Sequence, residues 1–261
     1  MMQPDNFRIT ALISVGKHPD SGRDRRAEQD ARAVEMALRL APQQLEVLHA
    51  GDVETPALRA YAGMGVKSLR VLSVGESADA VPTLVDYLQR KPPDIILTGK
   101  RAEQGESSGM LPFLLAEQLG IPLVMGIAEI VRVEGGEAQV LQALPRGQRR
   151  ALRVPLPFIA SVDMAASVPR QSAFGPGSRA IFACETAQVI AEDETRAAWQ
   201  VTAARKRPKR MKVVKAKTAA DRFKAATAKA QSEGGKVMRD EPVEKMAQAI
   251  YDLLLEEGVL R

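Results

Sequence analysis

One polar loop, rich in small residues and hydroxyls, is the segment of this sequence best suited to bind a ligand. Residues 99–109 read GKRAEQGESSG and run directly into a helical pattern. Ser107, Ser108 and the free amides at that helix start would suit an anion such as a phosphate, and Lys100 or Arg101 would add positive charge. Alternatively, one of the two serines simply caps the helix, because the spacing matches neither the Gly-x-Gly-x-x-Gly nor the Lys-Ser/Thr phosphate-loop pattern.

Residue types that carry catalysis are scarce. The chain has two histidines, His18 and His49, and one cysteine, Cys184. They do not form a cluster with the spacing that holds a transition metal, and neither histidine has a visible serine or cysteine partner. Carboxylate runs such as residues 192–194 lie on predicted helical faces, where solvation explains them. We therefore expect a binding protein, or a contributor to another protein's cofactor site, that performs no catalysis alone.

Short apolar runs alternate with helical patterns through the first half of the chain. The periodicity predicts helices at 28–40, 55–64, 81–90 and 108–119, and strands at 9–15, 45–49, 68–74, 94–98 and 123–127. This alternation predicts a parallel sheet covered by helices on both faces, a three-layer, Rossmann-like α/β domain. Right-handed crossovers bring the loops after the strands to one edge, where open parallel sheets bind ligands, and we expect loops 14–21, 49–54 and 99–109 to meet there.

The pattern changes after Gly126. Two apolar runs, 130–133 and 138–144, flank the sequence EGGE at 134–137, which is a hairpin signal. Further short strands are predicted at 151–154 and 157–163. We expect the α/β domain, residues 1–185, to carry an antiparallel hairpin extension.

The remainder of the chain is predicted to be a basic arm, residues 186–239, followed by a helix. Eight of the thirteen residues 205–217 are Lys or Arg. Asp240 can cap the final helix and Pro242 sits in its first turn. An apolar stripe at helical spacing then comprises Val243, Met246, Ala247, Ile250, Leu253 and Leu254. We expect the C-terminal segment 240–261 to bury this stripe on its own domain or on a partner subunit.

Composition limits the class of protein. The 261 residues are 45% hydrophobic and carry a net charge of +5, and the single cysteine excludes an internal disulfide and fits a reducing compartment. The first nine residues lack the apolar core of a signal peptide, and no apolar stretch is long enough to span a bilayer. We expect a cytoplasmic protein or, in a eukaryote, an organellar protein with its presequence removed, and in either case no membrane insertion. The basic balance alone does not choose between nucleic acid, an anionic membrane and an acidic protein partner.

Six stretches spread in order along nearly the whole chain carry a family pattern. They are ALISVGKHPD at 11–20, DARAVEMALRL at 30–40, AGMG at 62–65, DIILTGKRA at 94–102, PLPFIASVD with the later Pro-Arg at 155–170, and LEEGVL at 255–260. Together they resemble the β (smaller) subunit of the electron-transferring flavoproteins. The resemblance implies a redox carrier that works only as a heterodimer with a flavin-holding α subunit.

The resemblance also implies cofactors. In this family the β subunit binds AMP structurally at the sheet edge and touches FAD held mainly by the α subunit, and bifurcating relatives hold a second FAD in place of AMP. Here the residues AEQD at 27–30 and QGESSG at 104–109 replace the family's Asn-Pro-x-Asp and Asp-x-Asp-Thr-Gly-Gln motifs. Carried over, the nucleotide contacts are Ser14, Val15, Gly16, Ala27, Asp30, Gly51, Gly99, Glu106, Ser107, Ser108 and Gly109.

A partner-recognition loop is implied as well. The family inserts an exposed leucine into its flavin-dependent dehydrogenase partner, and Phe174, following Pro169 and Arg170, stands at that place here. The alternative is that Phe174 packs locally on its own loop. Three arginines at 146–150 replace a Gly-Gly-x-Glu hairpin of the family. Electrons would pass one at a time from the dehydrogenase to a membrane quinone oxidoreductase.

Two rival functions remain open. One is a stand-alone adenine-nucleotide-binding sensor built on the same α/β layers. The other is nucleic-acid binding through residues 205–217, which could neutralise phosphates but lack interleaved aromatic residues for stacking. A solvated arm, or a strap over an acidic α subunit, is the preferred interpretation, and no nucleic acid is expected as a partner.

Overall fold

The computed structural model describes residues 7–104, 107–200, 202, 218–220, 223, 238–239 and 241–256. The chain divides into two compact units, Met1–Trp199 and Gln200–Arg261.

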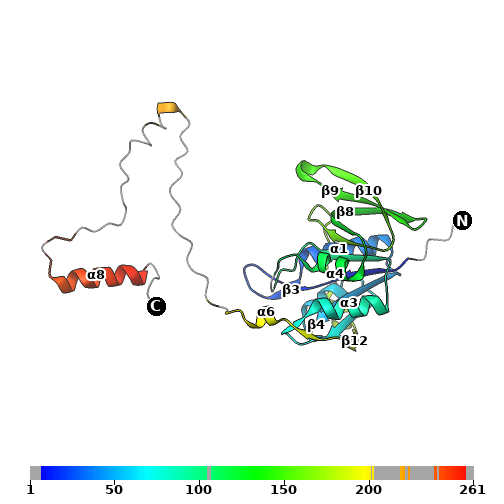
Figure 1. Cartoon of the computed structure of the whole chain (residues 1–261), viewed down its shortest axis with the longest axis horizontal. Coiled ribbons are helices and arrows are strands. Elements are labelled where there is room, and N and C mark those ends of the chain that lie inside the picture. Colours follow the sequence, from blue (N-terminus) through cyan, green and yellow to red (C-terminus); the bar gives the residue numbers. More distant parts are fainter. Residues whose placement is uncertain are drawn as a thin grey trace. The chain divides into compact units, whose positions relative to one another are not determined.

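A nine-stranded sheet lies at the centre of the first unit, in the order β10-β9-β8-β11-β7-β1-β4-β5-β12. Figure 1 shows β8, β9 and β10 together at one end of this unit and β12 at the other. The strands from β8 to β12 in this order are mutually parallel, whereas β8, β9 and β10 pair antiparallel. The predicted parallel α/β fold with an antiparallel extension is therefore confirmed. The strands are β1 Ile9–Leu12, β4 Leu45–Gly51, β5 Leu69–Ser73, β7 Ile95–Gly99, β8 Leu123–Glu134, β9 Glu137–Ala143, β10 Arg149–Pro155, β11 Phe158–Val162 and β12 Ala183–Thr186.

Helices cover both faces of the sheet because the central strands are apolar on both sides, so that every residue of β7 is buried. One core joins residues such as Ala11, Val47 and Leu97 to α1 and α2, and the other joins Leu12, Leu48 and Ile96 to α3 and α4. These four helices are α1 Glu28–Leu40, α2 Ala57–Ala62, α3 Ala80–Arg90 and α4 Leu111–Leu119. The smaller elements of this unit are β2 Val15–Lys17, β3 Asp24–Arg26, β6 Ala78–Asp79, β13 Ala191–Glu192, α5 Phe174–Ser178, α6 Glu194–Ala197 and a 3₁₀ turn, Pro145–Gly147.

The predicted strand at 9–15 is wrong in its second half. β1 ends at Leu12, and the chain then turns into β2, which pairs antiparallel with β3 as a small separate hairpin. The physical reason is a long-range contact, because Asp30 binds both the backbone and the side chain of Ser14. Apolar periodicity cannot show such a contact.

The predicted start of the fourth helix is also wrong. α4 begins at Leu111 rather than at 108, with Met110 at its N-cap position. Ser107 and Gly109 both have positive φ angles, of 54° and 80°, so neither can belong to a right-handed helix. Neither predicted serine is the helix cap, although the Met110 amide donates to Ser108 Oγ at 3.2 Å.

Strand β12 was not predicted. It pairs parallel with β5, and Glu185 in it contacts Arg70 at 3.4 Å and Arg90 at 2.9 Å. Its four residues are mostly exposed, so the local sequence lacks the apolar run that signals a strand.

The second unit contains α8, Val243–Glu256. Two backbone amides of its first turn, those of Lys245 and Met246, donate to the Pro242 carbonyl. The predicted cap, Asp240, and the basic run 205–217 lie outside the described residues. None of the described helices combines the length and the apolar character needed to cross a membrane.

Candidate functional site

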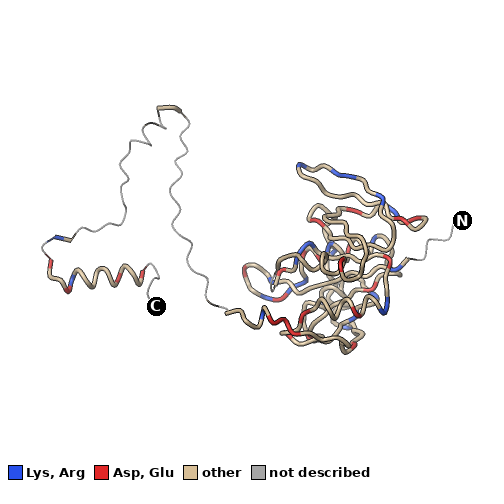
Figure 2. Tube along the Cα trace, viewed as in Figure 1, with Lys and Arg blue, Asp and Glu red and all other residues tan. Residues whose placement is uncertain are grey.

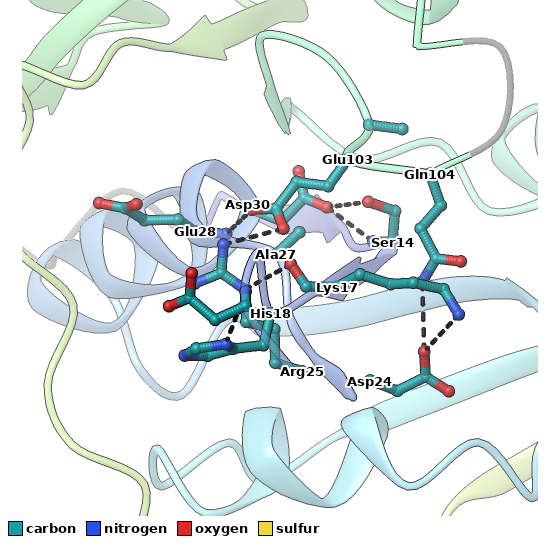
Figure 3. Close-up of polar contacts among 12 residues, drawn as sticks. Ser14, Lys17, His18, Asp24, Arg25, Ala27, Glu28, Asp30, Glu103 and Gln104 are labelled. Carbon is teal, nitrogen blue, oxygen red and sulfur yellow. Dashed lines mark hydrogen bonds and ion pairs between the residues drawn. The ribbon is translucent and has the colours of Figure 1, made fainter. Parts of the chain in front are cut away.

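A buried carboxylate holds the carboxyl ends of two central strands together. Asp30, in the first turn of α1, accepts hydrogen bonds from the Ser14 amide at 2.7 Å and from Ser14 Oγ at 2.5 Å (Figure 3). It also accepts from the Gly99 amide at 3.0 Å. Burial raises the pKa of Asp30 to about 6, and the three hydrogen bonds partly offset that effect. Gly99 has no side chain because a Cβ there would collide with the Asp30 carboxylate.

Tyr61 of α2 contacts the backbone at the same edge of the sheet. Its buried hydroxyl accepts from the Ala27 amide at 2.8 Å and donates to the Ser14 carbonyl at 3.0 Å. Ala27 is consequently 1% exposed, and Gly16 is buried against Glu103 and the Ala27 backbone. The structure places these two predicted contact residues in the wall behind the site rather than at its surface.

The polar loop after β7 is fixed to the β2–β3 hairpin. Glu103 accepts from the Glu28 amide at 2.8 Å and from Arg25 at 3.1 Å, while the Gln104 side chain donates to Asp24 at 3.4 Å (Figure 3). Within the loop, Ser107 Oγ donates to the Ala102 carbonyl at 2.8 Å. The loop is therefore held by its own chain at several points.

A cavity of about 220 Å³ opens between this loop and the ends of β1, β4 and β7. Six predicted site residues line it, namely Ser14, Asp30, Gly99, Ser107, Ser108 and Gly109. An adjoining groove of about 880 Å³ is lined by Val15 and Gly51 and shares Ser14, His49, Ala50, Ala80 and Ala102 with the cavity. Together they reach the size of small-molecule sites, roughly 300–1,000 Å³. Glu106 lies outside the described residues.

Two residues of this site were missed by the sequence analysis. His49 and Thr98, near the ends of β4 and β7, are both buried and line the cavity. His49 Nδ1 lies 2.9 Å from the Ile13 carbonyl, and burial lowers the pKa of the imidazole. The sequence did contain a signal for both residues. Each is a polar residue near the end of an apolar strand, and in a parallel sheet that position lies at the carboxyl edge.

The predicted docking segment lies elsewhere on the first unit. Phe174 begins α5 and is 89% exposed, so the alternative of local packing is wrong. The backbone next to Phe174 contacts the end of α2, where the Ala173 amide donates to the Gly63 carbonyl at 2.9 Å. A Cβ at Gly63 or at Gly177 would collide with the opposing backbone, so both glycines permit this close approach.

Arg170 anchors the same segment to α1. Its Nε and backbone amide donate to the buried Glu35 carboxylate at 2.7 and 3.1 Å, and Arg39 Nε adds a bond of 2.7 Å. Burial favours protonation of Glu35, but the hydrogen bonds from the two arginines outweigh it and hold the pKa at about 2. Arg170 therefore anchors the predicted docking segment to α1 through Glu35.

The Arg170→Ala substitution is expected to lower the free energy of unfolding by about 2 kcal/mol, because it leaves a buried carboxylate short of donors. The folded pKa of Glu35, about 2, lies below its ordinary value of 4.5, so this contribution is present above pH 4.5 and is lost as the pH falls toward 2. The variant has less of this contribution to lose, so its stability should fall less than that of the parent between pH 5 and pH 3, and the difference between the two should shrink. Urea unfolding at pH 3, 5 and 7 measures both effects, with Arg179→Ala as an exposed control. Identical acid sensitivity of variant and parent would contradict this account.

Comparison with known proteins decides the family. Residues 22–194 match the model of the electron transfer flavoprotein domain. Over an alignment of 268 residues that covers the whole of both chains, the sequence is 50% identical to the electron transfer flavoprotein subunit beta of Chromohalobacter salexigens. The chain belongs to the electron transfer flavoprotein family.

Family membership confirms the resemblance found in the sequence. The predicted docking segment, β3 and the cavity lining from Asp30 to Pro112 fall inside the matched range, whereas β2 and the lining residues Leu12, Ile13 and Ser14 precede it. Among the described residues, no group of three or more His, Cys, Asp or Glu side chains is arranged to hold a metal ion.

Three arginines form a basic edge beside β10. All three are exposed, with Arg146 in the turn before β10 at a φ of 59° and Arg149 and Arg150 at the start of the strand. Figure 2 shows this charge along the β9–β10 side of the extension. Register places Arg149 opposite Ala143, at the end of the antiparallel ladder away from the β8–β9 turn.

Proposed function

We propose that this chain is the β subunit of a heterodimeric electron transfer flavoprotein. The observation that carries the proposal is 50% identity along the full length to a curated protein of that name. In this role the chain performs no chemistry alone. It completes the FAD site of an α subunit and docks the donor dehydrogenase.

The cavity at the carboxyl edge is the proposed site of AMP, bound for structure rather than for catalysis. Ser107, Ser108 and Arg101 supply hydroxyls and positive charge at one part of its lining. Aliphatic residues such as Leu12, Leu48 and Leu84 supply another part. This division suits a nucleotide, which has an anionic phosphate and an apolar base. In a bifurcating carrier a second FAD would place its adenosine there.

Docking of the dehydrogenase is assigned to Phe174, with Pro169 and Arg170 holding its segment. An exposed aromatic side chain on a backbone fixed to α2 and α1 is the kind of anchor that dominates protein interfaces. Electrons would enter from a flavin-dependent dehydrogenase and leave, one at a time, to a membrane quinone oxidoreductase. A cytoplasmic location accompanies this role.

The C-terminal part is proposed to serve the heterodimer. The apolar stripe of α8 includes Met246, Ile250 and Leu253 at helical spacing. Packed on the α subunit, this stripe would strengthen the complex. Removing residues 240–261 should then weaken α-subunit binding.

A stand-alone nucleotide sensor is the second candidate function. It is favoured by one observation, that the cavity and its whole described lining lie within the first unit of this single chain. A stable monomer that holds a nucleotide and captures no flavoprotein partner would support it.

The test of the proposed function is FAD retention and electron transfer. The α subunit is purified with and without this chain, and FAD content is measured after gel filtration. The heterodimer is then mixed with the donor dehydrogenase and its substrate, and flavin reduction is followed by absorbance. Retention of FAD only in the presence of this chain, followed by reduction, supports the proposal. Equal FAD retention by the α subunit alone contradicts the claim that this chain completes the site.

A further inference from the structure

Thr98 is a buried hydroxyl residue in the lining of the edge cavity. It is 2% exposed, and its Oγ1 has no hydrogen-bond partner among the residues that the structure describes. It lies in β7, one residue before Gly99, and its neighbours in the lining include Leu12, Leu48 and Leu84. A polar atom is thus placed in the most apolar part of the site.

An unpaired buried hydroxyl is costly, at about 1–3 kcal/mol in protein substitutions. Valine has nearly the shape of threonine, suits a buried strand equally well and would avoid this cost. Strand β7 otherwise consists of Ile95, Ile96, Leu97 and Gly99, so the hydroxyl is an exception to an apolar pattern. A hydrogen bond from the Thr98 hydroxyl to a bound ligand would offset this cost and would explain why threonine stands at this position.

The lining divides between two kinds of surface. Ser108 and Arg101 are exposed, and Ser107 is half-buried, so this part of the cavity can hold a hydrated phosphate. Leu48 and Leu84 are buried together with Thr98. A nucleotide oriented by this difference would direct its base toward the aliphatic part, where Thr98 is the buried hydroxyl.

We infer that Thr98 is a specificity-determining residue that hydrogen-bonds the base of an adenine nucleotide in the edge cavity. The inference rests on the proposed function and adds a residue to the nucleotide site. A hydroxyl can donate to a ring nitrogen of adenine or accept from its amino group. The adenosine part is common to AMP and FAD, so either molecule could supply the base.

The experiment uses the intact heterodimer, freed of nucleotide by dialysis, and titrates it with AMP by calorimetry. Thr98→Val should weaken AMP binding roughly three- to tenfold, the size expected for one neutral hydrogen bond. The same variant without AMP should melt at the same temperature as the parent or higher, because an unpaired polar atom is removed. Thr98→Ser keeps the hydroxyl and should retain most of the affinity.

A matched control is available in α3. Thr83 is also buried, but its Oγ1 donates to the Val189 carbonyl at 2.7 Å, and it does not line the cavity. Thr83→Val should lower the melting temperature and leave AMP affinity unchanged. Thr98→Val should therefore change AMP affinity without lowering the melting temperature, whereas Thr83→Val should lower the melting temperature without changing AMP affinity. A purely structural role for Thr98 would not produce this difference.

The outcomes separate this inference from the proposed function. Unchanged AMP affinity in Thr98→Val, with the parent binding AMP, overturns the role of Thr98 and leaves the flavoprotein proposal standing. A flavin-containing heterodimer that takes up no AMP and releases one FAD on denaturation overturns both the AMP site and this inference. Release of two FAD per heterodimer assigns the base to FAD, and reduced content of the second FAD in Thr98→Val would support the role.

Discussion

Replacing Phe174 with aspartate is expected to lower kcat/KM for electron acceptance from the donor dehydrogenase at least tenfold. The side chain is 89% exposed at the start of α5, and a central aromatic anchor commonly carries about 2 kcal/mol or more of an interface. A charge placed there would also have to be desolvated on docking. Stopped-flow reduction of the heterodimer's flavin by the reduced dehydrogenase measures the effect.

The fold should not suffer from this change, because Phe174 contributes almost nothing to the core. FAD content and melting temperature are therefore expected to match those of the parent. Ile181, 95% exposed a short distance along the chain, gives a control in Ile181→Asp. If Phe174→Asp accepts electrons as fast as the parent, the docking role of this residue is wrong.

Replacing Asp30 with alanine is expected to cost about 2–5 kcal/mol of folding stability. The carboxylate accepts from two backbone amides, those of Ser14 and Gly99, and its residue is only 5% exposed. With the acceptor gone, the ends of β1 and β7 lose their shared anchor. Nucleotide affinity should fall together with stability, because both strand ends line the cavity.

The pH dependence of Asp30 has a definite sign. Its folded pKa, about 6, is raised above the ordinary value of 3.8, so the folded protein holds this proton more tightly than the unfolded chain. The contribution is fully present below pH 3.8 and is lost as the pH rises through 6. Asp30→Asn removes the titration, so its stability relative to the parent should improve from pH 4 to pH 7. Urea unfolding across this range measures it, and a constant difference would refute the assignment.

The helices and strands of the sheet domain followed from the sequence where the signal was local. Strand β7 was predicted from its apolar run and helix α1 from its apolar periodicity, and the structure shows every residue of Ile95–Gly99 buried. The hairpin was predicted from the glycine pair Gly135 and Gly136, and both glycines adopt the positive φ angles that the turn requires. Loops of three parallel strands then had to meet at one edge.

What the sequence did not reveal depends on distant partners. The β2–β3 hairpin forms because Asp30 turns the chain at Ser14, and the edge strand β12 forms because β5 offers an open side. Thr98 was overlooked because, inside an apolar strand, threonine reads as one more β-branched residue. Only the three-dimensional structure shows that its hydroxyl is buried without a hydrogen-bond partner among the described residues.

The central claim is tested most directly by co-expressing this chain with the candidate α subunit encoded by the neighbouring gene. The complex is then purified through a tag on this chain alone. The account predicts a yellow one-to-one complex with a flavin absorption spectrum, and free nucleotide released on denaturation. A colourless, well-folded protein that captures no α subunit would contradict it and would favour the nucleotide sensor.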